Sequence, residues 1–79
     1  MTNSEKYLQA FMDIFSADEE KSRTLEYNSI KAWDSIGHMQ LIAALENAFD
    51  IMMDTDDIID FSSYEKGKEI LAKYNVEFD

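Results

Sequence analysis

The chain has 79 residues with no cysteine, no proline and one histidine, and its formal net charge is −10. This length predicts a single domain over residues 1–79, and the lack of cysteine excludes disulfides, thiolate zinc sites and cysteine nucleophiles. The acidic charge argues against nucleic-acid binding, and no apolar run is long enough for stable membrane insertion. With two glycines and no proline, the composition favours a helical domain over a turn-rich β fold. Residues 1–10 lack the basic-then-apolar pattern of a signal peptide, so we expect a cytoplasmic location.

The first predicted helix covers about residues 4–16. Its apolar residues recur at helical spacing and form one stripe: Tyr7, Leu8, Phe11, Ile14 and Phe15. Thr2 and Glu5 are spaced as a capping box, although Asn3 or Ser4 could cap the helix equally well.

Residues 17–33 have no sustained period and predict a long loop. Isolated large apolar residues are expected to hold this loop against the core: Leu25, Tyr27, Ile30 and Trp33. Structureless loops longer than about 12–15 residues are uncommon in compact domains and are often functional.

The clearest predicted helix begins at Ser35 and extends through Phe49. Its expected buried stripe consists of Ile36, Met39, Ile42, Leu45 and Phe49. Asp34 is a good N-cap because its carboxylate can accept a backbone N–H of the first turn. The hydroxyl of Ser35 is then not needed for capping, and it lies where the free amides and the helix dipole favour an anion such as a phosphate ester.

A short third helix is predicted at residues 56–60, with Thr55 or Asp54 as its cap. Three apolar side chains near it are expected to point inward: Ile58, Ile59 and Phe61.

The last helix is predicted at about residues 63–74, where Ser62 and Glu65 have the spacing of a second capping box. Its expected buried stripe consists of Tyr64, Gly67, Ile70, Leu71 and Tyr74. A glycine inside a helix costs about 1 kcal/mol relative to alanine, and a close crossing of helices would explain Gly67.

Two possible catalytic or metal sites fail on their geometry. Ser35 and His38 share a helical turn but lack an orienting third group and an oxyanion hole, so they do not predict an enzyme. Four acidic residues have calcium-loop spacing: Asp54, Asp56, Asp60 and Glu65. The position at which that loop needs glycine is occupied by Ile59, which argues against calcium binding.

The negative charge is concentrated in the middle of the chain. Residues 34–65 contain eight acidic side chains and neither lysine nor arginine. This segment could be a solvated surface that keeps a small protein in solution, or a docking face for basic partners.

Residues 33–51 resemble the prosthetic-group segment of acyl carrier proteins; they read Trp-Asp-Ser-Ile-Gly-His-Met-Gln-Leu-Ile-Ala-Ala-Leu-Glu-Asn-Ala-Phe-Asp-Ile. In that family an Asp-Ser-Leu motif opens the second of four helices, and its serine carries 4′-phosphopantetheine. The order of helices, the long first loop, the acidity and the length agree over essentially the whole chain. The resemblance implies an all-α, four-helix acyl-carrier-protein-like bundle with a long first loop and a short third helix.

Carried over to this chain, the resemblance makes Ser35 the attachment site of 4′-phosphopantetheine, with Asp34 and Ile36 beside it. Further side chains would contact the arm or dock partner enzymes: Met39, Gln40, Glu46, Asp50, Asp56 and Asp57. The chain would be a monomeric carrier and not an enzyme. Its partners would be a phosphopantetheinyl transferase and acyl-loading and acyl-transfer enzymes with basic patches.

Some residues beside the serine depart from fatty-acid carriers. Ile36 replaces the usual leucine, Gln40 stands where an acid is common, and Trp33, Gly37 and His38 also differ. These differences favour a stand-alone carrier in a specialised pathway, for acylation of a surface polysaccharide, a polyketide or an amino acid, over housekeeping fatty-acid synthesis. The Met-Gln-Leu turn resembles carriers of D-alanine for wall polymers. The alternative is an acidic helical module that binds a basic protein partner and carries no prosthetic group.

Overall fold

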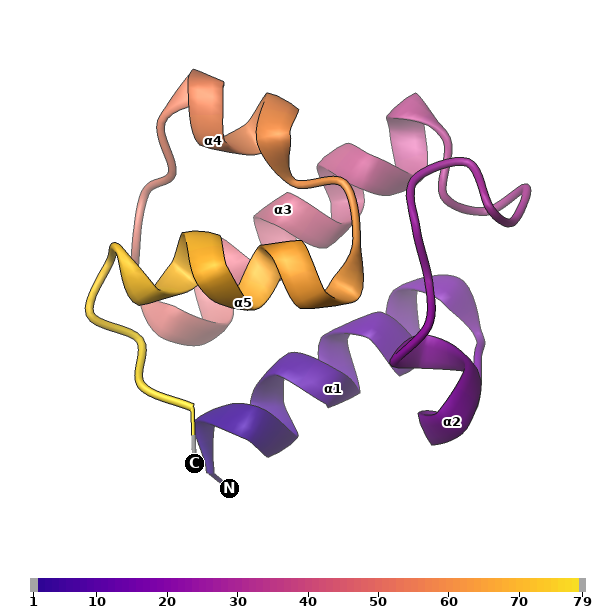
Figure 1. The fold of residues 1–79 in the computed structure, drawn as a ribbon, viewed down its shortest axis with the longest axis horizontal. Helices are drawn as coiled ribbons and strands as arrows, with labels where there is room; N and C mark the ends of the chain where they lie inside the picture. The colour runs from indigo at the N-terminus through magenta and orange to yellow at the C-terminus, as the bar shows by residue number, and fades with distance from the viewer. Residues whose placement is uncertain (1, 79) are drawn as a thin grey trace.

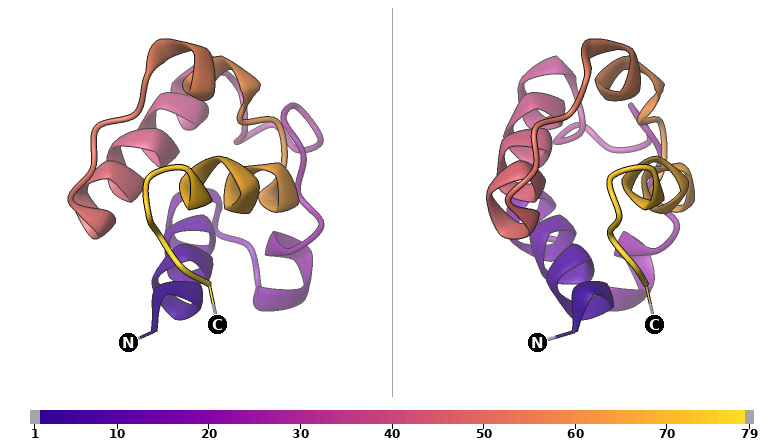
Figure 2. Two further views of the ribbon diagram at one scale, coloured as in Figure 1. Left: turned by 60° about the vertical axis from the view of Figure 1, so that its left-hand side comes forward. Right: turned by 90° about the vertical axis from the view of Figure 1, so that its left-hand side faces the viewer.

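The computed structural model describes residues 2–78, which form five α-helices and no strand. The helices are α1 (Asn3–Phe15), α2 (Glu19–Ser22), α3 (Ser35–Phe49), α4 (Thr55–Asp60) and α5 (Tyr64–Ala72). α1 packs against α3 and α2. Figures 1 and 2 show α5 across the core from α3, with α4 over one end. The predicted all-helical class is confirmed for these residues.

Two of the predicted helix caps are present. Thr2 and Glu5 form the capping box of α1, with the Thr2 hydroxyl 3.1 Å from the Glu5 nitrogen and the Glu5 carboxylate 2.9 Å from the Thr2 nitrogen. The Asp34 carboxylate accepts the backbone N–H of Gly37 at 2.9 Å and so begins α3. These caps fix where α1 and α3 begin, and they leave the Ser35 side chain outside the capping interaction.

The predicted cap of the last helix is wrong by one residue. Ser63, not Ser62, caps α5, because its hydroxyl accepts the backbone N–H of Lys66 at 3.0 Å. The carbonyl of Ser62 instead accepts the backbone N–H of Tyr27 at 2.8 Å. This bond ties the long loop to the start of α5, so the tertiary contact decides which of two adjacent serines becomes the cap.

The segment predicted as a structureless loop contains the one-turn helix α2. Asp18 caps it by accepting the backbone N–H of Lys21 at 2.8 Å, and Glu19 and Glu20 lie in its first turn, where acidic residues are favourable. Leu25 and Trp33 are buried as expected. The Ser22 side chain is also fully buried, and its hydroxyl has no hydrogen-bond partner within residues 2–78.

The buried face of α3 differs from the predicted stripe. Its buried residues are Gly37, Leu41, Ile42 and Leu45. Ile36 and Met39 are 71% and 53% exposed, so their assignment to the core is wrong. At the start of the helix Gly37 faces the core. A side chain does not fit at this position, because a Cβ would clash with the carbonyl oxygen of Ala32.

Aromatic side chains fill the core between the helices: Tyr7, Phe11, Phe15, Trp33, Phe61 and Tyr64. The Tyr7 hydroxyl donates to the Tyr64 carbonyl at 2.6 Å, and burial raises the pKa of this phenol. A Cβ on Gly67 would clash with the Phe61 ring and the Tyr7 hydroxyl. This contact explains the glycine in α5: the helix approaches core aromatic groups so closely that no side chain fits.

The last part of the chain returns to the start of α1, as Figures 1 and 2 show. The Asn3 side-chain amide donates to the Glu77 carbonyl at 3.0 Å, and Val76 is buried in the core. The helices predicted to end near residue 16 and residue 74 end at Phe15 and Ala72.

Candidate functional site

Ser35 is the first residue of α3, and it is exposed. Its hydroxyl oxygen lies 3.3 Å from the hydroxyl oxygen of Tyr27, which comes from the long loop. Because Asp34 supplies the cap, the Ser35 oxygen remains accessible at a helix end where backbone N–H groups are unpaired. A phosphate ester on this oxygen would be electrostatically favoured there.

A pocket of about 400 Å³ opens beside Ser35. It is bounded by the long loop, the first turn of α3, α4 and the segment after α4. Its lining residues are Tyr27, Ser35, His38, Met39, Ile58, Ile59, Phe61 and Ser62. Met39 and Ile59 are exposed, and Ile59, at 72%, corrects the prediction that it points inward; Phe61 is buried as predicted. An apolar pocket with a few hydroxyl groups is the ordinary form of a small-molecule site.

The imidazole of His38 forms a bridge across the wall of this pocket. The indole N–H of Trp33 donates to Nδ1 of His38 at 2.9 Å, and Nε2 lies 2.7 Å from the Ile58 carbonyl oxygen. Since Nδ1 accepts, the neutral ring carries its proton on Nε2 and donates it to that carbonyl. Both ring nitrogens are therefore engaged with Trp33 and Ile58, so neither serves as a base toward Ser35 in this arrangement.

The acidic side chains considered for docking do not share one environment. Asp50 and Asp56 are exposed. The Glu46 carboxylate accepts the backbone N–H of Met53 at 2.9 Å and so holds the segment between α3 and α4. Asp57 is only 7% exposed and is bound within the chain, which corrects its expected availability to a partner. Gln40 and Ile36 are exposed.

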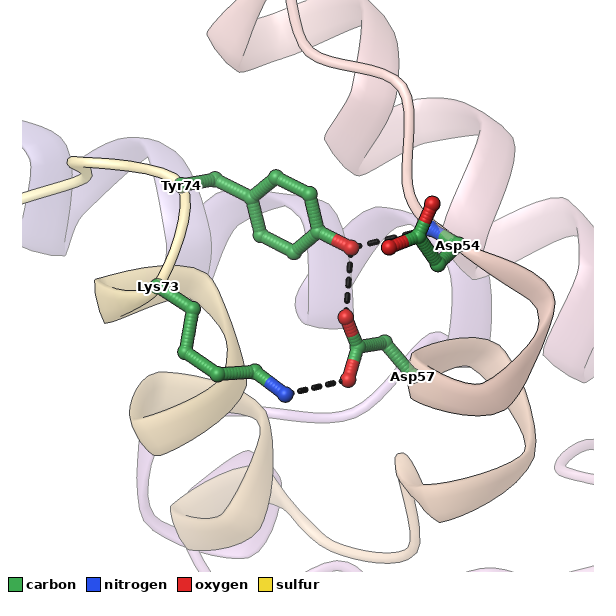
Figure 3. Close-up of polar contacts among 4 residues, drawn as sticks. All are labelled: Asp54, Asp57, Lys73 and Tyr74. Carbon is green, nitrogen blue, oxygen red and sulfur yellow. Dashed lines mark hydrogen bonds and ion pairs between the residues drawn. The ribbon is translucent and has the colours of Figure 1, made fainter.

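Asp57 joins α4 to the end of α5, as Figure 3 shows. Its carboxylate accepts hydrogen bonds from Lys73 and from the Tyr74 hydroxyl, both at 2.5 Å. The Lys73 hydrogen bond, followed by that of Tyr74, holds the pKa of Asp57 below its usual value. The same contacts raise the pKa of Lys73 and of Tyr74. This network fixes the start of α4 to the segment that follows α5.

Residues 2–78 contain neither a metal-binding cluster nor a membrane-spanning helix. Between residues 2 and 78, no group of three or more histidine, aspartate or glutamate side chains could hold a metal ion. In the same range, no helix has the length and apolar character needed to cross a lipid bilayer. Comparison with protein-family models, with curated proteins and with solved structures finds no significant match.

The pocket and the histidine bridge are features that sequence reasoning missed. The sequence pattern indicates Tyr27 only as a loop anchor, and it indicates His38 as a neighbour of Ser35 and a departure from fatty-acid carriers, not as a bridge. His38 lies 20 residues before Ile58, and its acceptor there is a backbone carbonyl, which every residue possesses. The only sequence signal was Trp33 five residues before His38, a spacing that carries no meaning until the chain turns into α3.

Proposed function

We propose that the chain is an acyl carrier that holds acyl or aminoacyl groups as thioesters on a 4′-phosphopantetheine arm attached to Ser35. The observation that carries the proposal is an exposed serine hydroxyl, not used for capping, at the N-terminus of a 15-residue helix, within the Asp34-Ser35-Ile36 motif. The arm would supply the thiol that a chain without cysteine lacks.

The residues around Ser35 fit such a group. The phosphate would lie next to the free N–H groups of the first turn of α3, where the helix dipole stabilises negative charge. The Ser35 oxygen would form the new bond to the pantetheine phosphate of coenzyme A and displace adenosine 3′,5′-bisphosphate, while its proton passes to the enzyme that attaches the arm. The apolar pocket beside Ser35 could shelter the start of the arm or its cargo, while exposed Ile36 and Met39 offer contact surface to a partner enzyme.

The exposed acids support docking to basic partners. Asp50 and Asp56 flank the segment that leads from α3 to α4. With a net charge of −10, the chain would attract a basic patch on a transferase or acyl-transfer enzyme over a distance of about one Debye length. Partners would be a phosphopantetheinyl transferase and enzymes of fatty-acid, polyketide or surface-polysaccharide-type synthesis.

The test compares loading of two serine variants. With coenzyme A, Mg²⁺ and a broad-specificity phosphopantetheinyl transferase, Ser62→Ala should gain one phosphopantetheine per chain, and Ser35→Ala should gain none. Ser62 is the matched control because it also lines the pocket. Loading of Ser35→Ala would overturn the assignment of the site. Failure of the folded wild-type chain to load with several transferases would favour the acidic module that binds a basic partner without a prosthetic group.

A further inference from the structure

We propose that His38 sets the length of the acyl group that this carrier shelters, by closing the inner end of the pocket beside Ser35. The inference rests on the proposed function, and it assigns a specificity role to a residue outside the attachment motif. It follows from the hydrogen bonds, the packing and the position of one side chain.

The His38 ring lies between the pocket and the aromatic core. It stacks on Trp33 with ring centroids 6.1 Å apart and an interplanar angle of 17°. It makes T-shaped contacts with the rings of Tyr27 and Phe61, with ring centroids 5.4 Å and 6.0 Å apart. Trp33 and Phe61 are almost fully buried, so the volume behind the ring is already filled by side chains.

The ring is also fixed in place from two sides. Trp33 donates to Nδ1, and Nε2 donates to the Ile58 carbonyl, so His38 connects the long loop, α3 and α4. An alkyl chain that passed beyond the pocket between α3 and α4 would have to displace these bonds. The indole N–H of Trp33 and the Ile58 carbonyl would then lose their partners, which costs free energy in this partly buried setting.

The remaining space suits a short cargo. A pocket of about 400 Å³ lies at the small end of the range for ligand sites and must also accommodate part of the arm. A short acyl group can bury its methylenes there against Met39, Ile58 and Ile59. A long aliphatic chain would leave its far end in water, since His38 blocks the way into the core.

The test measures protection of thioesters of graded length. The wild-type chain is loaded directly from acetyl-, butyryl-, hexanoyl- and dodecanoyl-coenzyme A, and each thioester is cleaved with hydroxylamine to a hydroxamate and the free thiol. Each buried methylene should lower the cleavage rate about fourfold. In the wild type we expect this protection to grow with length up to about the hexanoyl group and then to stop growing.

Three variants separate the role of His38 from general loosening of α4. His38→Leu removes the two hydrogen bonds that hold Trp33 and α4 to this wall, so these groups can move aside for a longer chain and protection should continue to grow through the dodecanoyl group. His38→Gln retains a donor and an acceptor and should restore the wild-type limit. Tyr74→Phe loosens α4 at Asp57 and does not alter a pocket-lining residue, so it should lower stability while keeping the wild-type limit.

Each result decides the inference. Protection of the wild type that keeps growing through the dodecanoyl group would overturn it, as would the same limit in His38→Leu. If His38→Leu does not fold, the wild-type series and the His38→Gln variant still test the inference. Protection in His38→Gln that keeps growing through the dodecanoyl group would contradict the role of the two hydrogen bonds. Failure to load any acyl-phosphopantetheine onto the folded chain would instead remove the proposed function, which is a separate result from loading without a length limit.

Discussion

The Tyr74 hydroxyl stands between the carboxylate of Asp57 and the start of α4. It donates to Asp57 at 2.5 Å, and its oxygen accepts the backbone N–H of Asp54 at 2.9 Å. In an ordinary capping box the carboxylate at the third helical position accepts this N–H directly. Here the tyrosine of another segment bridges the two, and the Asp54 side chain makes no cap hydrogen bond. A six-residue helix with little intrinsic stability is thereby capped by the turn that follows α5.

Replacing Tyr74 with phenylalanine should loosen α4 and lower the melting temperature by about 4–8 °C, the effect expected for loss of a net hydrogen bond in a domain of this size. Thermal unfolding followed by circular dichroism gives this shift. Amide hydrogen exchange should accelerate at Asp54 while exchange in α1 changes little. Tyr27→Phe is the control, because its hydroxyl makes a long 3.3 Å contact at the surface. Equal shifts in the two variants would contradict the capping role.

The Asp57 network should also govern stability in acid. Lys73 and Tyr74 depress the pKa of this carboxyl in the folded chain, so its contribution is fully present above the unfolded pKa of about 3.9. The contribution is lost as the pH falls through the lower, folded pKa. We therefore expect Asp57→Asn to be less stable than wild type at pH 6, with the difference shrinking below about pH 4.

The check is a pair of denaturation series from neutral pH into acid, with Asp60→Asn as an exposed control on the same helix. The control should keep the wild-type profile. A constant gap between Asp57→Asn and wild type at every pH would show that the aspartate contributes through packing alone.

The buried hydroxyl of Ser22 predicts a stabilising substitution. Its side chain is fully buried without a hydrogen-bond partner in the described chain, so Ser22→Ala should stabilise the fold by about 1 kcal/mol. Ser29→Ala is the matched control, because its hydroxyl accepts from the Glu26 nitrogen at 3.0 Å and donates to the Glu26 carbonyl at 2.6 Å. Urea titrations should move the two midpoints in opposite directions. A destabilised Ser22→Ala would mean that the hydroxyl does find a partner in solution.

Charge-reversal variants should distinguish docking through particular acidic residues from an effect of the total net charge on the loading rate. Asp56→Lys should lower the second-order rate constant of transferase loading severalfold at low salt, because Asp56 is exposed and belongs to the proposed docking face. At 1 M salt, where the Debye length is about 3 Å, the difference should vanish. Asp13→Lys makes the same change in net charge at an exposed position of α1, and it should lower the rate constant less. Equal effects of both variants, or an effect independent of salt, would argue against a localised docking face.

Sequence reasoning succeeded where one side chain decides the local structure. The caps by Thr2 and Asp34 depend on short-range hydrogen bonds, and periodicity placed the start of α3 correctly. Periodicity alone could not show that Ile36 and Met39 face outward, although the resemblance makes both residues contacts of the arm, since an apolar residue near a pocket has the same spacing as one in the core. Charge counting likewise could not distinguish exposed Asp56 from buried Asp57, which is bound by residues 16 and 17 positions later.

The measurement that tests the central claim most directly is the mass of the intact wild-type chain after incubation with coenzyme A, Mg²⁺ and a broad-specificity phosphopantetheinyl transferase, followed by fragmentation of the product. The account predicts a gain of one phosphopantetheine, located by the fragment ions on Ser35. A folded chain that gains no mass with several transferases, or that carries the group on another residue, would contradict it.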